Sequence, residues 1–238
     1  MQKIWLDFIN LGWNEKRDSI TGDILAAHKE YFGSDVVIST DGSWTTFEIA
    51  LPPLNSIQQE EMLLKYLHAE ILPIFKKYNL RLLATGLNPG ETGVTDEYLT
   101  TKSFYKTVKR FWRLLNLGFP TAANQTNISV RLHEVVRVIN ALSPIGGLVM
   151  SVSANSSISE WKKLRWKEFR HPLFSKLFVT DYSSFQDIVC NPPQKPFASF
   201  SQYLLSFLDA KPFMIITPMR DDQFVVLDKK ITWLEYLK

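Results

Sequence analysis

A glutamate on an alternating stretch of chain is the first residue whose type and position could support chemistry. Residues 43–50 follow the turn signal Asp41-Gly42 and predict a β-strand. Alternation places Phe47 and Ile49 on one face of this strand and Glu48 on the other. Glu48 therefore faces either solvent or a polar cavity. Composition alone favours solvent, because charged side chains are seldom buried without a partner.

A row of neutral polar side chains is the second feature that could bind a ligand. Residues 123–130 predict a strand on which Gln125, Asn127 and Ser129 share one face. Such a row is common on a wet surface, and it also suits a cavity that must orient a polar ligand without adding charge. The residues by themselves leave these two interpretations equal.

Familiar motifs for nucleotide binding and nucleophilic catalysis do not occur in the sequence. It contains no Walker A sequence, no G-x-G-x-x-G after a strand, no kinase signature and no G-x-S-x-G elbow. Cys190 is the only cysteine, and the four histidines are isolated, so neither a zinc site nor a Cys–His dyad has support. Any enzymatic chemistry must then come from residues spread over the faces of a sheet.

Composition and charge limit the classes of protein to which the chain can belong. A length of 238 residues and a hydrophobic content of 45% are enough to fill a core. The net charge of +3 is too mild to indicate nucleic acid, and the basic stretch 162–167 is more typical of a solvated helix face. The N-terminus lacks the pattern of a signal peptide, and no apolar run approaches the roughly 20 residues that span a bilayer. We therefore expect a cytoplasmic protein that binds neither nucleic acid nor membrane.

The elements that would position these residues mix helices and strands. Ser56 and Gln59 form a capping-box pattern at the start of a helix that Asn79 ends, with Pro73 expected to kink or break it. Further helices are expected at 101–115, 132–142, 161–170 and 199–209, and further strands at 80–87, 213–217 and 223–227. This order lacks strict βαβ alternation, so an α+β fold with a mainly antiparallel sheet is favoured over a doubly wound fold.

The sequence also predicts an interruption after one helix and a chain without linkers between domains. Pro144 and Gly146-Gly147 are expected to interrupt the chain after the helix at 132–142. No repeat, low-complexity tract or convincing linker divides the sequence. We therefore expect a single domain over residues 1–238.

Short blocks in a fixed order carry a resemblance to a known family. They are Thr46 to Pro53 before a long helix, Arg81 to Pro89, Thr101 to Lys106, Gln125 to Ile128, Ala141 to Ile145, Ala154 to Ser156, Trp166, Ser201 to Met214, and Arg220-Asp221. In this order they resemble the glutamate–cysteine ligase family, whose blocks include K-G-R-Y-K, Q-V-N-L, A-L-x-P-I, A-N-S-P and R-D-G.

The resemblance implies both a fold and a reaction. The fold is glutamine-synthetase-like, with a mainly antiparallel sheet curved into a half-barrel and helices on its outer side. In the reaction, ATP phosphorylates the γ-carboxylate of glutamate, and the amine of a second substrate attacks the acyl phosphate. Such an enzyme needs Mg²⁺, which prefers carboxylate and phosphate oxygens, and cations where charge builds on the phosphoryl group. Amino acids and ATP are then the ligands, and a second copy or a partner chain could complete the site.

Metal ligands and catalytic contacts follow from the matched positions. Glu48 matches the strand-borne glutamate that binds magnesium in the family, and Glu15 would be the nearest substitute for the acidic ligands near the N-terminus. Lys102 and Arg220 would be catalytic contacts to phosphate or carboxylate groups. Each cation also has a simpler interpretation as a solvated surface charge.

Nucleotide and substrate contacts are implied for three further residues. Gln125 and Asn127 would be neutral ligands to the metal-bound nucleotide or the substrate. Arg110 would contact phosphate or carboxylate, although for this residue the solvated surface charge is favoured.

The chain departs from the family at its acidic N-terminal motif. The family has G-x-E-x-E where this chain has residues 12–16, so that Asn14 and Lys16 stand at the acidic positions. A lysine in place of a metal ligand reverses the local charge. Glu15 could substitute only if the register shifts by one, which turns it to the other face of a strand.

Two further departures leave two functions open. Phe104 stands where the family has an arginine, which removes a planar bidentate donor. The chain ends at Lys238, where a segment of the family with substrate contacts would follow. The first hypothesis is an ATP-dependent carboxylate–amine ligase, whose amine substrate could be one other than cysteine. The second is a non-catalytic relative that binds a small molecule or a protein.

Overall fold

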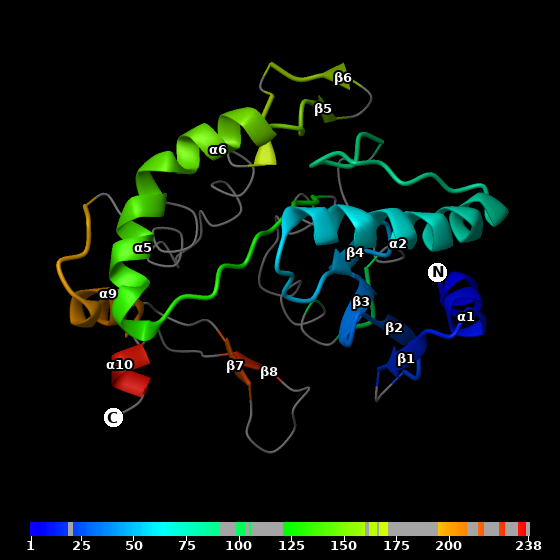
Figure 1. Cartoon of the computed structure of the whole chain (residues 1–238), viewed down its shortest axis with the longest axis horizontal. Coiled ribbons are helices and arrows are strands. Elements are labelled where there is room, and N and C mark those ends of the chain that lie inside the picture. The colour runs from blue at the N-terminus through cyan, green and yellow to red at the C-terminus, as the bar shows by residue number, and fades with distance from the viewer. Residues whose placement is uncertain are drawn as a thin grey trace. The chain divides into compact units, whose positions relative to one another are not determined.

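The chain folds into two compact units, each described here by itself. The computed structural model describes residues 1–18, 21–90, 99–102, 105, 121–159, 162–165, 167–170, 195–208, 214–216, 224–226 and 233–236 (Figure 1). The first unit contains residues 1–84 and 94–106, and the second contains residues 85–93 and 107–238. The single ligase-like domain expected over residues 1–238 stays a prediction.

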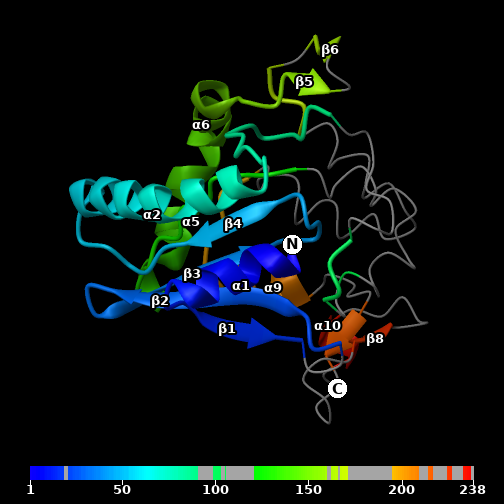
Figure 2. The same cartoon turned by 90° about the vertical axis from the view of Figure 1, so that its right-hand side faces the viewer.

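A four-stranded antiparallel sheet forms the frame of the first unit. Its strands are β1 (Asn14–Arg17), β2 (Ile24–Tyr31), β3 (Ser34–Thr40) and β4 (Phe47–Ala50), hydrogen-bonded in chain order. Figure 2 shows them side by side as an open sheet. The predicted α+β class with an antiparallel sheet is thereby confirmed, and the glutamine-synthetase-like half-barrel stays a prediction.

A tight turn sets the register of the two central strands. Phe32 and Gly33 connect β2 to β3, and both have positive φ, at 54° and 78°. Two consecutive positive φ values are typical of the turns whose twist matches that of paired strands. Ala27 then pairs with Ile38, and Tyr31 pairs with Ser34.

Two helices cover one face of this sheet. They are α1 (Gln2–Asn10) and α2 (Ile57–Lys77), and their apolar side chains join those of the strands in one core. Its fully buried members include Trp5, Phe8, Trp13, Ile24, Ile38, Leu63, Leu67 and Ile71. The strands thus have one covered face, which carries Ala27, Ile38 and Ile49. The opposite face, called the open face below, carries the alternate residues.

The start of α2 confirms the predicted capping box in a shifted form. The Ser56 hydroxyl oxygen accepts a hydrogen bond from the Gln59 amide at 3.2 Å. The side chain of Gln59 accepts in return from the amide of Asn55, one residue before the cap, at 3.0 Å. Both bonds satisfy amides that the first turn of a helix leaves without a partner.

The end of α2 also follows the sequence. Asn79 adopts a positive φ of 55°, and the Leu80 amide donates to the Phe75 carbonyl at 2.9 Å. This arrangement closes a helix with a left-handed residue, as the asparagine predicted. Pro73 lies inside α2 without ending it, so the predicted break did not form.

One long helical stretch dominates the second unit. The 3₁₀ turns η1 (Leu132–Glu134) and η2 (Ser143–Ile145) alternate with the helices α5 (Val135–Leu142) and α6 (Gly146–Ser153). The predicted interruption is confirmed as a change of helix type, because α5 ends at Leu142 and the 3₁₀ turn η2 separates it from α6. Pro144 stands in the first turn of η2, where its missing amide hydrogen costs no hydrogen bond. Gly146 adopts helical angles, with φ −55° and ψ −41°.

This stretch corrects an expectation about apolar length. Residues 132–153 form 22 consecutive helical positions, and an 18-residue window within them has a mean hydropathy of 1.6, which is long and apolar enough by length and composition to cross a membrane. The expectation that no apolar run approaches bilayer length was therefore wrong. That expectation treated Pro144 and the paired glycines as the end of the helical stretch, whereas helical backbone continues through them.

Shorter elements make up the other helices and strands described in the second unit. They are β5 (Ile158–Ser159), β6 (Lys162–Lys163), α9 (Phe200–Leu208), β7 (Met214–Ile216), β8 (Phe224–Val226) and α10 (Trp233–Tyr236). The predicted helix at 199–209 and the predicted pair of strands near the C-terminus are confirmed, since β7 and β8 pair antiparallel. Ser199 caps α9 by accepting from the Gln202 amide at 3.1 Å.

Three predicted elements differ from the structure. Residues 80–87 and 123–130 form no regular strand, and the described residues between 162 and 169 form no helix. The strand at 43–50 is shorter than expected and begins at Phe47. The helix expected at 101–115 lies outside the described residues except for 101, 102 and 105.

Candidate functional site

The open face of the sheet carries the predicted metal ligand Glu48. Paired residues lie on one face, and a row across the four strands runs from Lys16 through Ala26 and Ser39 to Glu48. Glu48 is exposed, and its carboxylate accepts a hydrogen bond from the Ser39 hydroxyl at 3.1 Å. The predicted alternation with Phe47 is confirmed, because Phe47 packs against the core.

Glu15 lies on the other face of the sheet. It pairs with Ala27, whose row continues through the buried Ile38. Its carboxylate accepts two hydrogen bonds from the Arg17 guanidinium, at 2.7 and 2.6 Å. These bonds from Arg17 hold the pKa of Glu15 below its ordinary value. The structure therefore does not bring Glu15 and Glu48 together.

Lys102, the predicted catalytic lysine, lies beside Glu48. Its Nζ donates to the backbone carbonyl of Thr40 at the end of β3, and it lies 5.9 Å from the centre of the Tyr105 ring. Burial lowers the pKa of Lys102, while the carboxylates of Asp41 and Glu48 oppose that shift. A partly desolvated ammonium next to two carboxylates can stabilise a transferring anionic group.

Tyr105 and Asp41 complete this cluster, and sequence reasoning did not select either of them. The Tyr105 hydroxyl donates to the Asp41 carboxylate. Burial raises the pKa of Tyr105 well above its ordinary value, and the Asp41 hydrogen bond adds to the shift. In the sequence, Asp41 was noted only as part of the turn signal Asp41-Gly42, and Tyr105 only as a residue of the block that resembles K-G-R-Y-K.

Buried hydroxyls occur on residues that adjoin the lysine in the chain or accept its hydrogen bond. In the described part of the chain, the side-chain oxygens of Thr40, Thr100 and Thr101 are buried without a hydrogen-bond partner. Thr40 and Thr100 are 0% and 1% exposed. An unsatisfied buried hydroxyl costs roughly 1–3 kcal/mol. Thr40 pairs with the core residue Phe47, so its hydroxyl points to the covered face of the sheet. The hydroxyls of Thr100 and Thr101, on the two residues before Lys102, are groups that a polar ligand could satisfy.

The donor set of this cluster suits Mg²⁺ bound together with a phosphate. Mg²⁺ is usually held by one or two carboxylates and by substrate phosphates. Glu48 and Asp41 provide two carboxylates that both act on Lys102. Among the described residues, no group of three or more His, Cys, Asp or Glu side chains converges to hold a metal without such a substrate.

The remaining predicted contacts lie elsewhere or outside the described residues. Gln125 and Asn127 belong to the second unit, where both side chains are exposed on a stretch that is not a strand. The shared strand face expected for them does not form, because residues 122–130 are in no strand, and the nearest pairing among the described residues is an isolated bridge between Leu87 and Thr121. Arg110 and Arg220 lie outside the described residues.

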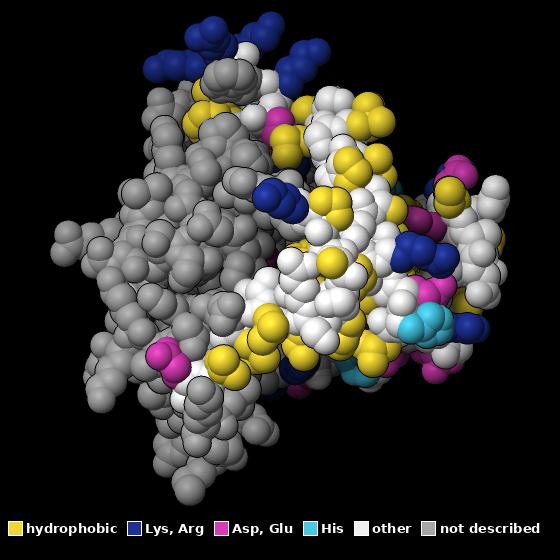
Figure 3. Space-filling model, turned by 90° about the vertical axis from the view of Figure 1, so that its left-hand side faces the viewer, with side chains coloured by type: hydrophobic (Ala, Val, Ile, Leu, Met, Phe, Trp, Pro, Cys, Tyr) yellow, Lys and Arg dark blue, Asp and Glu magenta, His cyan; other side chains and the backbone are white. Residues whose placement is uncertain are grey.

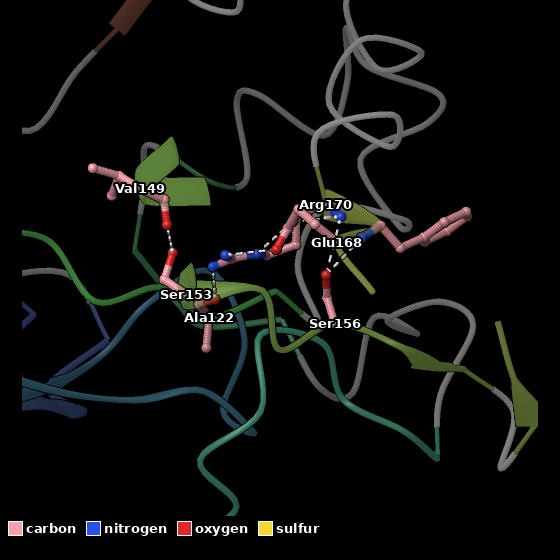
Figure 4. A network of polar contacts seen from close by, with 7 residues as sticks. Ala122, Val149, Ser153, Ser156, Glu168 and Arg170 are labelled. Atoms are coloured by element: carbon pink, nitrogen blue, oxygen red, sulfur yellow. Dashed lines mark hydrogen bonds and ion pairs between the residues drawn. The ribbon is translucent and has the colours of Figure 1, made fainter. Parts of the chain in front are cut away.

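A second polar network ties distant segments of the second unit together. Figure 4 shows the Arg170 guanidinium between Glu168 and Ala122. Two nitrogens of Arg170 donate to the Glu168 carboxylate, each at 3.0 Å, and a third donates to the Ala122 carbonyl at 2.5 Å. The burial of Glu168 tends to raise its pKa, and the bonds from Arg170 outweigh this, so that the pKa lies below its ordinary value.

The same network fixes the segment Asn155-Ser156. The Ser156 hydroxyl oxygen accepts from the amide of Phe169 at 2.7 Å, and the Gly86 amide donates to the Asn155 carbonyl at 3.0 Å. A Cβ on Gly86 would lie 2.3 Å from the Asn155 side-chain oxygen. Gly86 and Asn155 belong to two of the blocks that carry the resemblance, so these blocks meet in space. Their contacts here are structural.

Comparison with protein-family models, curated proteins and solved structures found no match. The resemblance to the glutamate–cysteine ligase family thus stays a prediction that rests on the residues themselves.

The open-face cluster is the better candidate site of the two networks. It combines a desolvated lysine, two carboxylates and unsatisfied hydroxyls, whereas the Arg170 network satisfies its own polar groups internally. Chemically, the cluster can bind an anion and position a divalent cation beside it.

Proposed function

We propose that the chain is an ATP-dependent carboxylate–amine ligase that resembles glutamate–cysteine ligases, with its site on the open face of the first unit. The observation that carries this proposal is the placement of Lys102 beside Glu48 and Asp41. Two of the predicted site residues come together there, although they are 54 positions apart in sequence (102 − 48). The fold class shown for the chain is compatible with this function and does not by itself select it.

The proposed reaction joins a carboxylate to an amine in two transfers. The substrate carboxylate attacks the γ-phosphorus of ATP, and the bond to the bridging oxygen breaks to release ADP. The amine then attacks the acyl carbon, inorganic phosphate leaves, and the amine loses a proton to form the amide. Glutamate is the carboxylate substrate that the resemblance implies, and the amine is an amino acid.

Each residue of the cluster has a defined task in this scheme. The Lys102 ammonium would bind the transferring phosphoryl oxygens, where partial burial strengthens its field. Glu48 and Asp41 would hold Mg²⁺, which when bound neutralises phosphate charge. The hydroxyl of Thr100 would donate to the substrate.

A non-catalytic binding function is the second candidate, favoured by one observation. Lys16 lies on the same face and in the same row as Glu48. Its positive charge stands where the family places an acidic ligand, which weakens the attraction for a second metal ion. In this case the cluster would bind an anionic metabolite without turnover.

Calorimetric titration and product analysis together test the proposal. The chain is titrated with MgATP, and ADP release is then followed with glutamate and a panel of amino acids as amines. The expected result is saturable MgATP binding with ADP formation that depends on both substrates. MgATP binding without ADP favours the non-catalytic function, and the absence of any MgATP binding overturns the ligase proposal.

Two variants locate the site. Glu48→Gln removes a metal ligand while keeping its shape, and should weaken MgATP binding about tenfold or more. Glu30→Gln is the matched control, because Glu30 is an exposed glutamate of β2 on the same face. Equal binding by the Glu48→Gln and Glu30→Gln proteins would show that the open face does not hold the nucleotide.

A further inference from the structure

The surface of the long helical stretch exposes an unusual amount of apolar side chain. No residue of the 22-residue stretch is buried. Its exposed members are Leu132, Leu142, Ile145, Leu148, Val149, Met150 and Val152, with 38% to 80% of each exposed. Figure 3 shows hydrophobic side chains along this face of the molecule. We call this surface the apolar helix face; a patch of this kind marks a contact with a partner or a membrane.

Only part of this helix has a covering partner among the described residues. Asn140 on α5 donates to the carbonyl of Phe197 at 2.8 Å and accepts from its amide at 2.9 Å, which fixes α5 next to the start of α9. α6 has no such attachment in the described part of the chain, and its residues 148–150 and 152 are apolar on several sides. A helix that is apolar all round requires an apolar surrounding.

Positive charge gathers next to the C-terminal end of α6. The short hairpin β5–β6 follows the helix, and Lys162, Lys163, Arg165 and Lys167 on and after it are exposed. Figure 3 shows Lys and Arg side chains together at the top of the view, beside the apolar helix face. A second copy of the chain would bring the same positive charge, whereas an anionic lipid surface offers both apolar and negative groups.

The geometry of the flanking chain excludes a helix that crosses the bilayer. Ala122 precedes the helix by 10 residues and Asn155 follows it by two, yet Ala122 bonds to Arg170, and the Ala122 and Asn155 backbones both bond to Gly86. Crossing would place the helix ends about 33 Å apart, and residues 122–131 would have to return through lipid as non-helical backbone. A contact of this helix with a bilayer would therefore run along the surface.

We infer that α6, with the end of α5, docks on the surface of an anionic lipid bilayer. The apolar side chains at positions 148, 149 and 152 enter the boundary between headgroups and acyl chains, and the basic residues after β5 contact lipid phosphates. Such interfacial binding combines buried apolar area with attraction to anionic lipid. It is independent of the ligase proposal, because every residue involved belongs to the second unit.

Vesicle flotation tests this inference. The full chain is floated with phosphatidylcholine vesicles and with vesicles that also contain phosphatidylglycerol. Binding is expected only to the anionic vesicles and should weaken as salt is raised. A chain that floats with neither kind of vesicle overturns the inference.

Matched variants separate docking from misfolding and from self-association. Leu148→Ser/Val152→Ser changes side chains that are 66% and 80% exposed, so folding should be unaffected, and vesicle binding should fall about tenfold. Ile57→Ser is the control, since Ile57 is 78% exposed on α2. Lys163→Glu/Lys167→Glu should abolish the preference for anionic lipid. The unaltered chain is also tested for self-association without lipid. If it self-associates and Leu148→Ser/Val152→Ser abolishes this, a second copy covers the apolar helix face, and the inference fails.

Discussion

Lys16 and Glu48 occupy the two edge strands of the sheet and lie on the same face, linked by the paired residues Ala26 and Ser39. The face that would hold a metal ion thus carries a cation at one edge and a carboxylate at the other. Three strand spacings separate them by about 14 Å. At that distance the lysine modulates a charged ligand without blocking it.

Replacing Lys16 with glutamine should strengthen the binding of free Mg²⁺ at the proposed site. Coulomb repulsion between Lys16 and a divalent cation over about 14 Å in water lowers the affinity for that cation roughly two- to threefold. Calorimetry at low ionic strength measures the effect. Lys76→Gln serves as the control, because Lys76 is exposed on α2 at the covered side of the sheet. An unchanged or lower affinity of Lys16→Gln for Mg²⁺ would show that Lys16 does not repel a cation at this site.

Glu70 should be a strong contributor to the stability of the first unit. Its carboxylate accepts hydrogen bonds from the Trp13 indole at 3.0 Å, from the Lys29 ammonium at 2.7 Å and from the Tyr31 hydroxyl at 2.9 Å. Glu70→Ala leaves these donors without a partner and should lower the free energy of unfolding by about 2–4 kcal/mol. Urea denaturation checks this.

The free energy of unfolding measured at decreasing pH provides a second test of the contribution of Glu70. Burial tends to raise its pKa, and the hydrogen bonds from Lys29, Trp13 and Tyr31 outweigh this, so the pKa in the folded state is lowered. The stability that this ionisation adds is fully present above the unfolded-state pKa of about 4.3 and is lost as pH falls through the folded-state value. Glu61→Gln on the same helix should change stability by less than about 0.5 kcal/mol, since its ion pair with Lys65 is exposed.

A pair of glycine variants tests the packing of the second unit. Gly86→Ala would place a Cβ 2.3 Å from the Asn155 side-chain oxygen and 3.0 Å from Arg170, and should destabilise by roughly 1–3 kcal/mol. Gly147→Ala has open space around its Cβ inside a helix and should stabilise by about 0.5–1 kcal/mol. Thermal unfolding distinguishes the two. Equal effects would show that Gly86 is not held against Asn155.

The two serine caps should contribute similar stabilities. Ser56 and Ser199 each accept from the amide three residues on, and the glutamines there, Gln59 and Gln202, each bond back to the amide before the cap. Replacing either serine with alanine should cost about 1 kcal/mol. Aspartate at either position should restore most of the loss, because it accepts the same bond. If aspartate and alanine behave alike in urea denaturation, the cap bonds do not form.

Alkaline pH should destabilise the chain partly through Tyr105. Burial and the bond to Asp41 raise its folded-state pKa well above the unfolded value of about 10. A raised pKa adds stability that is present below pH about 10 and is lost as pH rises further, because only the unfolded chain then releases the proton. Tyr105→Phe should flatten this loss in unfolding experiments. Tyr66→Phe, at an exposed ring on α2, should leave it unchanged.

Local signals in the sequence determined the elements that depend on neighbouring residues. Ser56 and Asn79 fixed both ends of α2, and the alternation of Phe47 and Glu48 assigned the two faces of β4. Caps and alternation act within a few residues, so they can be read without a partner. The placement of Glu48 on an exposed face followed from the same local rule.

Tertiary structure decided everything that needs a distant partner. Residues 123–130 have the composition of a strand but remain unpaired, and the segment near Phe169 is held by Ser156 instead of forming a helix. Strand pairing and such side-chain bonds depend on which segments meet, and sequence spacing does not encode that. Only the folded chain could therefore bring Lys102 to Glu48, turn Glu15 to the other face, and carry a helix through Pro144.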